Sequence, residues 1–340
     1  MVRIERLSAG INAAWDEFVR QHPASTFCHL SGWSQVAAAA FEVVCCNLIA
    51  YRGGEVAGVL PLTLVKRPLL GAALISSPFC VYGGPLAEDA ETLDALTREA
   101  LDLAGRLDVN LLEVRGLALD GSWHQRDVFS TFSLPLVDDP AANLLRIRVR
   151  QRAVVRKAIE LGLPATLDQD LAAFYRIYCR SLQALGTPVY PRRWLTALEQ
   201  VFGQTMSVTS VWHDGQRICS VLSFFFRNEV LPYYAAGLPA ARTLGAFPFL
   251  YYTLMNDAAS RGCQTFDFGR SAVGSGAWHF KKNFGAVERR LAYSFHCRNG
   301  AGVPALDPGN ARLAALGKVW SRLPAAVVDR LGPALSIYAV

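Results

Sequence analysis

The most chemically dense stretch of the chain runs from Gln264 to Gly285 and reads QTFDFGRSAVGSGAWHFKKNFG. Its charged and hydroxyl-bearing candidates for a site are Asp267, Arg270, Ser271, Lys281 and Lys282. Asp267 lies between two phenylalanines, in a run that predicts a buried strand with one acid at its end. The small residues 274–276 predict a loop where backbone N–H groups approach an anion. The alternative is a plain turn with solvated lysines.

Length and composition bound the fold that must position these residues. At 340 residues the chain is long for one core and suits two domains. Hydrophobic residues make up 52%, which argues against disorder. No run of about 18 uninterrupted apolar residues exists to span a bilayer. The N-terminal MVRIERLSAG carries charges where a signal peptide needs an apolar core, so we expect a cytoplasmic protein.

Cysteine, histidine and charge patterns narrow the chemistry. The eight cysteines form no CxxC pair and lie mostly in apolar runs, which predicts reduced, buried thiols. The histidines lack metal-like spacing with acids, and no convincing Ser/His/Asp order occurs, so we expect no metal and no covalent nucleophile. A net charge of +6 favours an anionic partner: nucleotide phosphates, coenzyme A, tRNA or an acidic membrane. Because the basic residues are dispersed, we expect no binding to duplex DNA.

The predicted elements repeat in outline, with a connection expected over 120–145. In the first half, helices are expected over 11–22, 33–41 and 91–107, and strands around a hairpin at 52–55 and over 74–82 and 110–114. In the second half, helices are expected over 171–185, 192–202 and 247–261, and strands over 206–213, 218–226, 230–236 and 266–268. This order predicts an α/β (α+β) fold with two similar domains, 1–140 and 146–300, whose mixed central sheets are flanked by helices.

Two basic segments lie outside the first stretch. LLRIRVRQRAVVRKAIELGLP predicts a helix on which Arg152 and Arg156 share one face, either meeting an anion or forming an exposed basic helix. The tail, residues 301–340, alternates basic residues with Leu, Val and Trp320. We expect it to dock on the first domain, and peripheral contact with an anionic membrane is the alternative.

The second half resembles the GNAT acyltransferase fold in the order of its elements. Arg242-x-x-Gly245-Ala246 lies where that superfamily keeps its pyrophosphate-binding turn, although Phe247 replaces the final small residue. FDFGRS and GSGAWHFKKNFG resemble the signature of FemAB-related proteins with a BioF2-like acetyltransferase domain. LLEVRG, LGTPVYP, LPYYAAG and VWSRLPAAVVDRLGP extend the resemblance to the group associated with exosortase (PEP-CTERM) and exopolysaccharide loci. Ser275 and the segment 286–290 depart from the usual pattern.

The resemblance implies tandem GNAT-like domains and transfer of an acyl group from acyl-CoA to an amine. Asp267 would accept or orient the amine proton, or only cap the turn after it. Lys281 would neutralise a phosphate or an oxyanion, or remain solvated. Tyr234 would protonate the leaving thiolate, or pack as a core residue.

The remaining implied contacts are with donor and acceptor. Arg242 and the Gly245 and Ala246 amides would hold the pyrophosphate of acyl-CoA. The predicted substrate contacts are Arg270, Ser271, Lys282, Arg152 and Arg156. The acceptor class left open is a sugar nucleotide, a lipid-linked glycan intermediate or a free amino compound. Two alternatives remain: a FemAB-like aminoacyltransferase that uses aminoacyl-tRNA, and a non-catalytic member that binds a donor or a partner enzyme.

Overall fold

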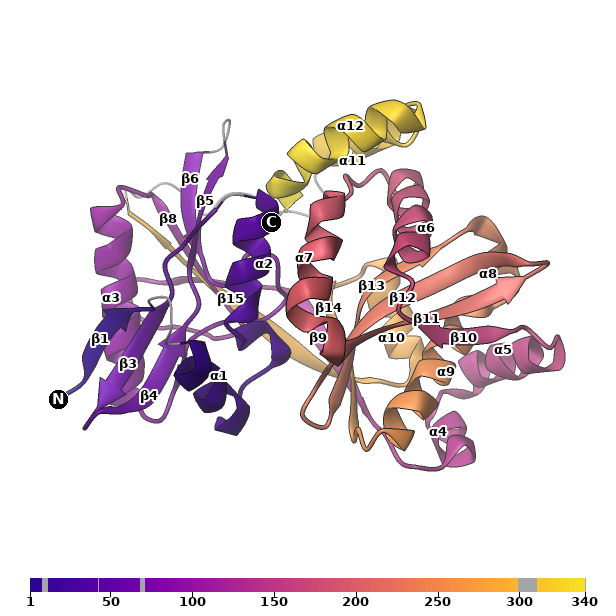
Figure 1. Cartoon of the computed structure of the whole chain (residues 1–340), viewed down its shortest axis with the longest axis horizontal. Coiled ribbons are helices and arrows are strands. Elements are labelled where there is room, and N and C mark those ends of the chain that lie inside the picture. The colour runs from indigo at the N-terminus through magenta and orange to yellow at the C-terminus, as the bar shows by residue number, and fades with distance from the viewer. Residues whose placement is uncertain (8–11, 42, 68–70, 299–310, 340) are drawn as a thin grey trace. The chain divides into compact units, whose positions relative to one another are not determined.

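The computed structural model describes residues 1–7, 12–41, 43–67, 71–298 and 311–339. They form two compact units, and we describe each by itself (Figure 1). The first unit contains residues 1–128 and returns at Leu291, and the second contains Phe129–Arg290 and the C-terminal helices. The α/β class predicted from the sequence is confirmed.

The elements of the first unit are β1 (Arg3–Arg6), α1 (Asn12–Gln21), α2 (Gly32–Phe41), β2 (Val44–Cys45), β3 (Leu48–Arg52), β4 (Glu55–Leu60), β5 (Thr63–Arg67), β6 (Gly71–Ile75), β7 (Leu86–Ala87), α3 (Ala90–Arg106) and β8 (Leu111–Arg115). Those of the second unit are α4 (Pro140–Arg146), α5 (Val149–Glu160), β10 (Ala165–Asp168), α6 (Leu171–Ala184), α7 (Arg192–Phe202), β11 (Met206–His213), β12 (Gln216–Phe226), β13 (Glu229–Gly237), α8 (Pro239–Thr243), α9 (Ala246–Ser260), β14 (Thr265–Ala272), α10 (Gly276–Phe284), α11 (Ala311–Trp320) and α12 (Ala325–Leu335). Strands β9 (His124–Pro135) and β15 (Val287–Cys297) carry the chain between the units.

Each unit contains one pair of parallel strands joined through a helix. In the first unit β6 pairs with β8 in parallel, with α3 between them in the chain. In the second unit β13 pairs with β14 in parallel, with α9 between them. The neighbours of each parallel pair are antiparallel: β5 with β6 and β15 with β8 in the first case, and β12 with β13 and β9 with β14 in the second. The repeat expected from the element order is therefore present in the strand pairing.

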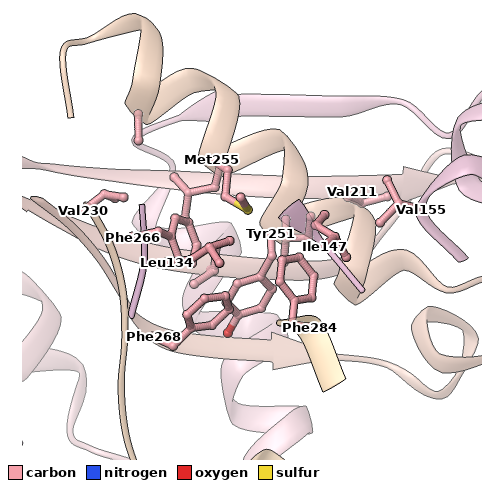
Figure 2. Close-up of a cluster of buried hydrophobic side chains, with 14 of the residues drawn as sticks. Leu134, Ile147, Val155, Val211, Val230, Tyr251, Met255, Phe266, Phe268 and Phe284 are labelled. Atoms are coloured by element: carbon pink, nitrogen blue, oxygen red, sulfur yellow. The ribbon is translucent and has the colours of Figure 1, made fainter. Parts of the chain in front are cut away.

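The sheet of the second unit has the strand order β10-β11-β12-β13-β14-β9 and helices on both faces. Alternation along β12 directs Val221 to the cluster that contains α9 and directs Phe224 to the opposite face, against Phe202 of α7. Figure 2 shows the α9 side, where Tyr251 stacks on Phe268 with ring centroids 5.6 Å apart. This apolar cluster fixes β14 against α9, so that polar side chains of β14 must point elsewhere.

The parallel pair β13/β14 is short. Its register contains only Glu229 opposite Thr265 and Val230 opposite Phe266. β13 then continues to Gly237 and β14 to Ala272 without further pairing to each other. Both strands also carry register shifts: β13 against β12 at Leu222/Ser223, and β14 against β9 between Asp267 and Gly269. β13 and β14 are therefore paired over two residues each and diverge after Val230 and Phe266.

The structure differs from two of the predicted segments, 120–145 and 74–82. The segment 120–145 is not a connection, because it contains strand β9 and helix α4. The alternation of β9 was hidden in the sequence, since its first half is largely exposed and only Phe132 and Leu134 reach the core of the second unit. Strand 74–82 is also shorter than expected, since β6 ends at Ile75 and Ser77 adopts a positive φ of 40°.

The described part of the C-terminal tail groups with the second unit, and not with the first as the sequence analysis expected. Gln183 Nε2 of α6 donates to the Leu323 O at 2.8 Å, between α11 and α12. The backbones of Gly186 and Gly317 also meet closely, because a Cβ on Gly186 would lie 2.4 Å from the Gly317 O. The domain limits at residues 140 and 146 stay predictions, and the limit at 300 lies outside the described residues.

Candidate active site

Asp267 lies on β14 at the bulge that follows the paired end of the strand. Its Oδ1 accepts a hydrogen bond from the Gly269 N–H at 2.8 Å and a longer one from Thr131 Oγ1 of β9 at 3.4 Å. Gly269 has a φ of +66°, a conformation that favours glycine. The Asp267 carboxylate thus caps the turn that follows it. This is the second of the two roles that the sequence analysis gave to Asp267. Asp267 is half-buried, and the catalytic role assigned to it remains a prediction.

Lys281 of α10 is buried behind the same bulge, with 8% of its surface exposed. Its Nζ donates to the Gly269 O at 2.9 Å and to the Arg270 O at 3.0 Å. Burial lowers the pKa of Lys281 from 10.5 to about 7, while the negative charge of Asp267 acts to raise it and Arg270 to lower it. Lys281, Asp267 and Arg270 are therefore electrostatically coupled, and Lys281 is not a solvated surface lysine.

Glu229 is a second carboxylate near Asp267 that the sequence analysis missed. It stands opposite Thr265 in the parallel pair, and Asp267 lies two residues farther along β14, on the same face as Thr265. Burial raises the pKa of Glu229, and the charge of Asp267 raises it further, while Arg227 and Arg289 lower it. A raised pKa makes the Glu229 carboxylate a stronger proton acceptor than an ordinary glutamate. Only the parallel register brings it to Asp267, so no local motif could have revealed it.

The other three candidate residues of this stretch, Arg270, Ser271 and Lys282, have different surroundings. Arg270 lies with its guanidinium carbon 4.4 Å from the ring centroid of Phe129. The Ser271 hydroxyl is buried and has no hydrogen-bond partner within the part of the chain that the structure describes. Lys282 is exposed, with its Nζ 4.4 Å from the ring centroid of Trp278 and 4.0 Å from a Glu288 oxygen.

Residues 274–276 lead from a turn into α10: Gly274 lies in the turn, Ser275 is the N-cap and Gly276 begins the helix. The Ser275 side chain caps this helix by accepting from the Trp278 N–H at 3.2 Å. Trp278 Nε1 in turn donates to Glu288 Oε1 at 2.8 Å, and Ser130 Oγ donates to the same oxygen at 2.7 Å. These bonds lower the pKa of Glu288, with the Ser130 bond the larger cause. The helix thereby presents Lys281 to β14, a geometry that the glycine-rich sequence concealed.

The predicted pyrophosphate turn lies between α8 and α9, at the start of α9 as expected. Gly245 caps the helix with a φ of +65°, Ala246 is buried and Arg242 is exposed. Val154 of α5 covers Gly245, because a Cβ added there would lie 2.4 Å from Val154 Cγ1. The α5 helix therefore forms one wall of the turn. The third position of α9 is Pro248, so this helix start offers fewer free N–H groups than an ordinary one.

Arg152 and Arg156 of α5 differ in their contacts. Arg152 donates through Nε and Nη2 to the Ile147 O at 3.1 and 3.0 Å, and through Nη2 to the Leu145 O at 2.7 Å. It therefore satisfies carbonyl groups at the end of α4. Arg156 is exposed.

We expect Arg152→Lys to lower the free energy of unfolding by about 1 kcal/mol, because lysine cannot reproduce the planar donor fork. Arg156→Lys is the matched control, and its free energy of unfolding should equal that of the wild type. Denaturant titration at pH 7 measures both. Equal stability of the two variants would show that the contacts of Arg152 with α4 contribute nothing.

Tyr234 of β13 is buried on the face of the sheet opposite α9. Its hydroxyl accepts a hydrogen bond from Trp194 Nε1 of α7 at 3.0 Å. The rings of Tyr178 and Tyr190 lie 5.8 and 6.1 Å from it, centroid to centroid. Tyr234 thus belongs to an aromatic cluster with Tyr178, Tyr190 and Trp194. Its role as a proton donor stays a prediction.

Within the described ranges, no group of three or more His, Cys, Asp or Glu side chains could hold a metal ion. No helix among the residues that the structure describes is long and apolar enough to cross a membrane.

Comparison with known proteins gives the second unit a family context. Residues 145–282 match the model of the Acetyltransferase (GNAT) domain family. No curated protein matches the chain in sequence. The match contains Lys281, Lys282 and the α8–α9 turn but ends before Glu288.

Solved structures with a similar fold cover both units. The chain is similar to FemX with a TM-score of 0.68 at 16% identity, over 87% of this chain and 98% of FemX. It is also similar to a tandem GNAT protein from the clavulanic acid biosynthesis pathway, with a TM-score of 0.53 at 15% identity, over 86% of this chain and 98% of that one. The tandem GNAT-like fold is therefore confirmed. A GNAT domain supports acyl or aminoacyl transfer as the general reaction class.

Proposed function

We propose that the chain is an N-acyltransferase that moves an acyl group from acyl-CoA to an amine. The observation that carries this proposal is the match of residues 145–282 to the GNAT acetyltransferase domain, within a fold similar to FemX along most of the chain. Acyl transfer of this kind needs a bound thioester, a group that takes the proton of the amine, and donors for the developing oxyanion.

The divergence of β13 from β14 supports a site for the donor. Beyond Val230 and Phe266 the two strands no longer pair with each other, and in this proposal an extended segment of the donor pairs along their facing edges. The pantetheine arm of coenzyme A carries two amides that can form such strand-like hydrogen bonds. The arm would point to the paired end of the strands, and the phosphates would lie toward Arg242 and the start of α9.

The two carboxylates at the paired end support the proton transfer. Glu229 lies in the paired segment and Asp267 one residue beyond it, so the thioester of an inserted arm would end next to both. Glu229, with its raised pKa, is the better proton acceptor, and Asp267 orients the amine. Lys281 holds the backbone of β14 through two carbonyl groups and so positions Asp267.

The acceptor in this proposal is an amine of a sugar nucleotide, a glycan intermediate or a free amino compound. The resemblance to the exosortase-associated and exopolysaccharide-associated group supports a glycan-linked pathway. The four exposed cations of the α5 segment, Arg148, Arg150, Arg156 and Lys157, favour one second candidate, a FemAB-like transferase that uses aminoacyl-tRNA.

Calorimetric titration of the full chain with acetyl-CoA tests the donor. We expect binding, and we expect Arg242→Ala to weaken it by about tenfold, because a charge-assisted hydrogen bond contributes about 1.5 kcal/mol or more. The exposed Arg192→Ala on α7 removes the same charge elsewhere and should bind as the wild type does. Absence of acetyl-CoA binding, together with tight and steeply salt-dependent binding of tRNA, would replace this proposal by the second candidate.

A further inference from the structure

A cavity of about 260 Å³ lies on the second unit, away from the β14 bulge. It is formed by the first half of α6, the β11–β12 hairpin and Leu238 after β13. Its polar lining residues are Arg176, Arg180, Gln216 and Arg217, beside the ring of Trp212. Since a water molecule occupies about 30 Å³ in the liquid, the cavity has room for a polyatomic ion and its nearest waters.

Arg217 is held rigidly at the wall of this cavity. Its side chain is 9% exposed, and its Nη1 donates to Ser210 Oγ at 2.9 Å. Its Nη2 donates to Asp168 Oδ2 at 3.2 Å and lies 3.8 Å from an Asp170 oxygen. Its guanidinium carbon lies 4.9 Å from the ring centroid of Trp212. These contacts fix the guanidinium plane before any ligand arrives, which lowers the entropy cost of binding.

The two arginines of α6 carry charge that the described residues do not compensate. Arg176 and Arg180 are one helical turn apart, so they share the face that lines the cavity. No carboxylate in the described ranges forms an ion pair with either of them. Asp168 and Asp170 are directed at Arg217 and offset its single charge. The three arginines and two carboxylates leave one net positive charge at the wall, with Arg176 and Arg180 not engaged by either carboxylate, which favours an anionic ligand.

We propose that this cavity binds a phosphate-bearing group of a small molecule, namely a phosphomonoester or a diphosphate. Planar guanidinium groups bind phosphate oxygens through paired hydrogen bonds, and Arg176 and Arg180 supply two such groups at the cavity. The limited volume between a helix and a hairpin suits a small ligand and not an extended nucleic acid backbone. This inference goes beyond acyl transfer, because it concerns residues that the proposed reaction does not use.

Inorganic pyrophosphate is the probe, titrated calorimetrically into the full chain at low ionic strength. We expect saturable binding with a component that Arg242→Ala leaves unchanged, and we expect the double variant Arg176→Gln/Arg180→Gln to weaken that component by at least about tenfold. Both side chains are exposed, so the variant should fold as the wild type does. Arg192→Gln, at an exposed position on α7, is the control variant. Its affinity for pyrophosphate should equal that of the wild type.

A second titration separates the two sources of the phosphate group. If the cavity takes the 3′-phosphate of coenzyme A, the double variant loses affinity for coenzyme A but not for dephospho-coenzyme A. If it takes a nucleotide sugar, the loss occurs for UDP-N-acetylglucosamine instead. Either result supports the proposal, whether or not acyl transfer is detected. Equal pyrophosphate affinity of the wild type and the double variant, or binding of RNA alone, would overturn it.

Discussion

Asp267→Asn should slow acyl transfer by about a hundredfold, because general base or orienting carboxylates contribute roughly that much to such reactions. The exchange is isosteric, and asparagine can still accept the Gly269 N–H through its side-chain oxygen. The melting temperature should therefore stay close to that of the wild type. The loss should appear in kcat measured by thiol release from acetyl-CoA with an amine acceptor.

The pH dependence of the Asp267→Asn variant carries separate information. Since the charge of Asp267 contributes to the raised pKa of Glu229, its removal should shift the acidic limb of the rate profile to lower pH. Asp214→Asn, in the exposed turn between β11 and β12, is the matched control and should leave rate and profile unchanged. A kcat within about threefold of the wild type would remove Asp267 from the chemistry.

Lys281→Met should abolish a pH dependence of stability that the wild type shows. In the folded chain the pKa of Lys281 is about 7, below its ordinary 10.5, so the unfolded chain binds more protons between these values. The free energy of unfolding of the wild type therefore rises with pH through this window, and the contribution is lost as pH falls toward 7. The expected rise from pH 7 to pH 8.5 is roughly 1.5 kcal/mol, and methionine, which does not titrate, should lack it.

The same variant tests how Lys281 serves the site. Methionine fills the buried space but leaves the Gly269 and Arg270 carbonyl groups without their amine donor, so the bulge that carries Asp267 loosens. We expect kcat to fall by about a hundredfold with little change in KM for acetyl-CoA. Lys66→Met on β5 is the control, because Lys66 is exposed and belongs to neither proposed site, so its kcat should equal that of the wild type. Full activity of Lys281→Met would show that the amine neither reacts nor positions the strand.

Local patterns predicted most elements of the second unit because their apolar periods coincide with burial. Helix α7 and strand β11 have the limits expected from the sequence, and α6 and α9 end within one residue of theirs. In the first half of β9 the apolar period does not coincide with burial. A strand that is exposed along much of its length shows no clear alternation in its sequence. The motif Arg242-x-x-Gly245 was also readable, because a left-handed cap needs glycine at a single position.

What the sequence alone determined was the α/β class and the repeated element order, while the site residues that it suggested stay predictions. Only the tertiary structure decided that Lys281 is buried against two carbonyl groups, that Arg152 caps α4, and that Glu229 approaches Asp267. The physical reason is range: helix caps and apolar periods depend on residues a few positions apart, which a sequence displays directly. Burial of a charge and the parallel register of β13 with β14 depend on segments brought together by α9, whose contacts no short motif records.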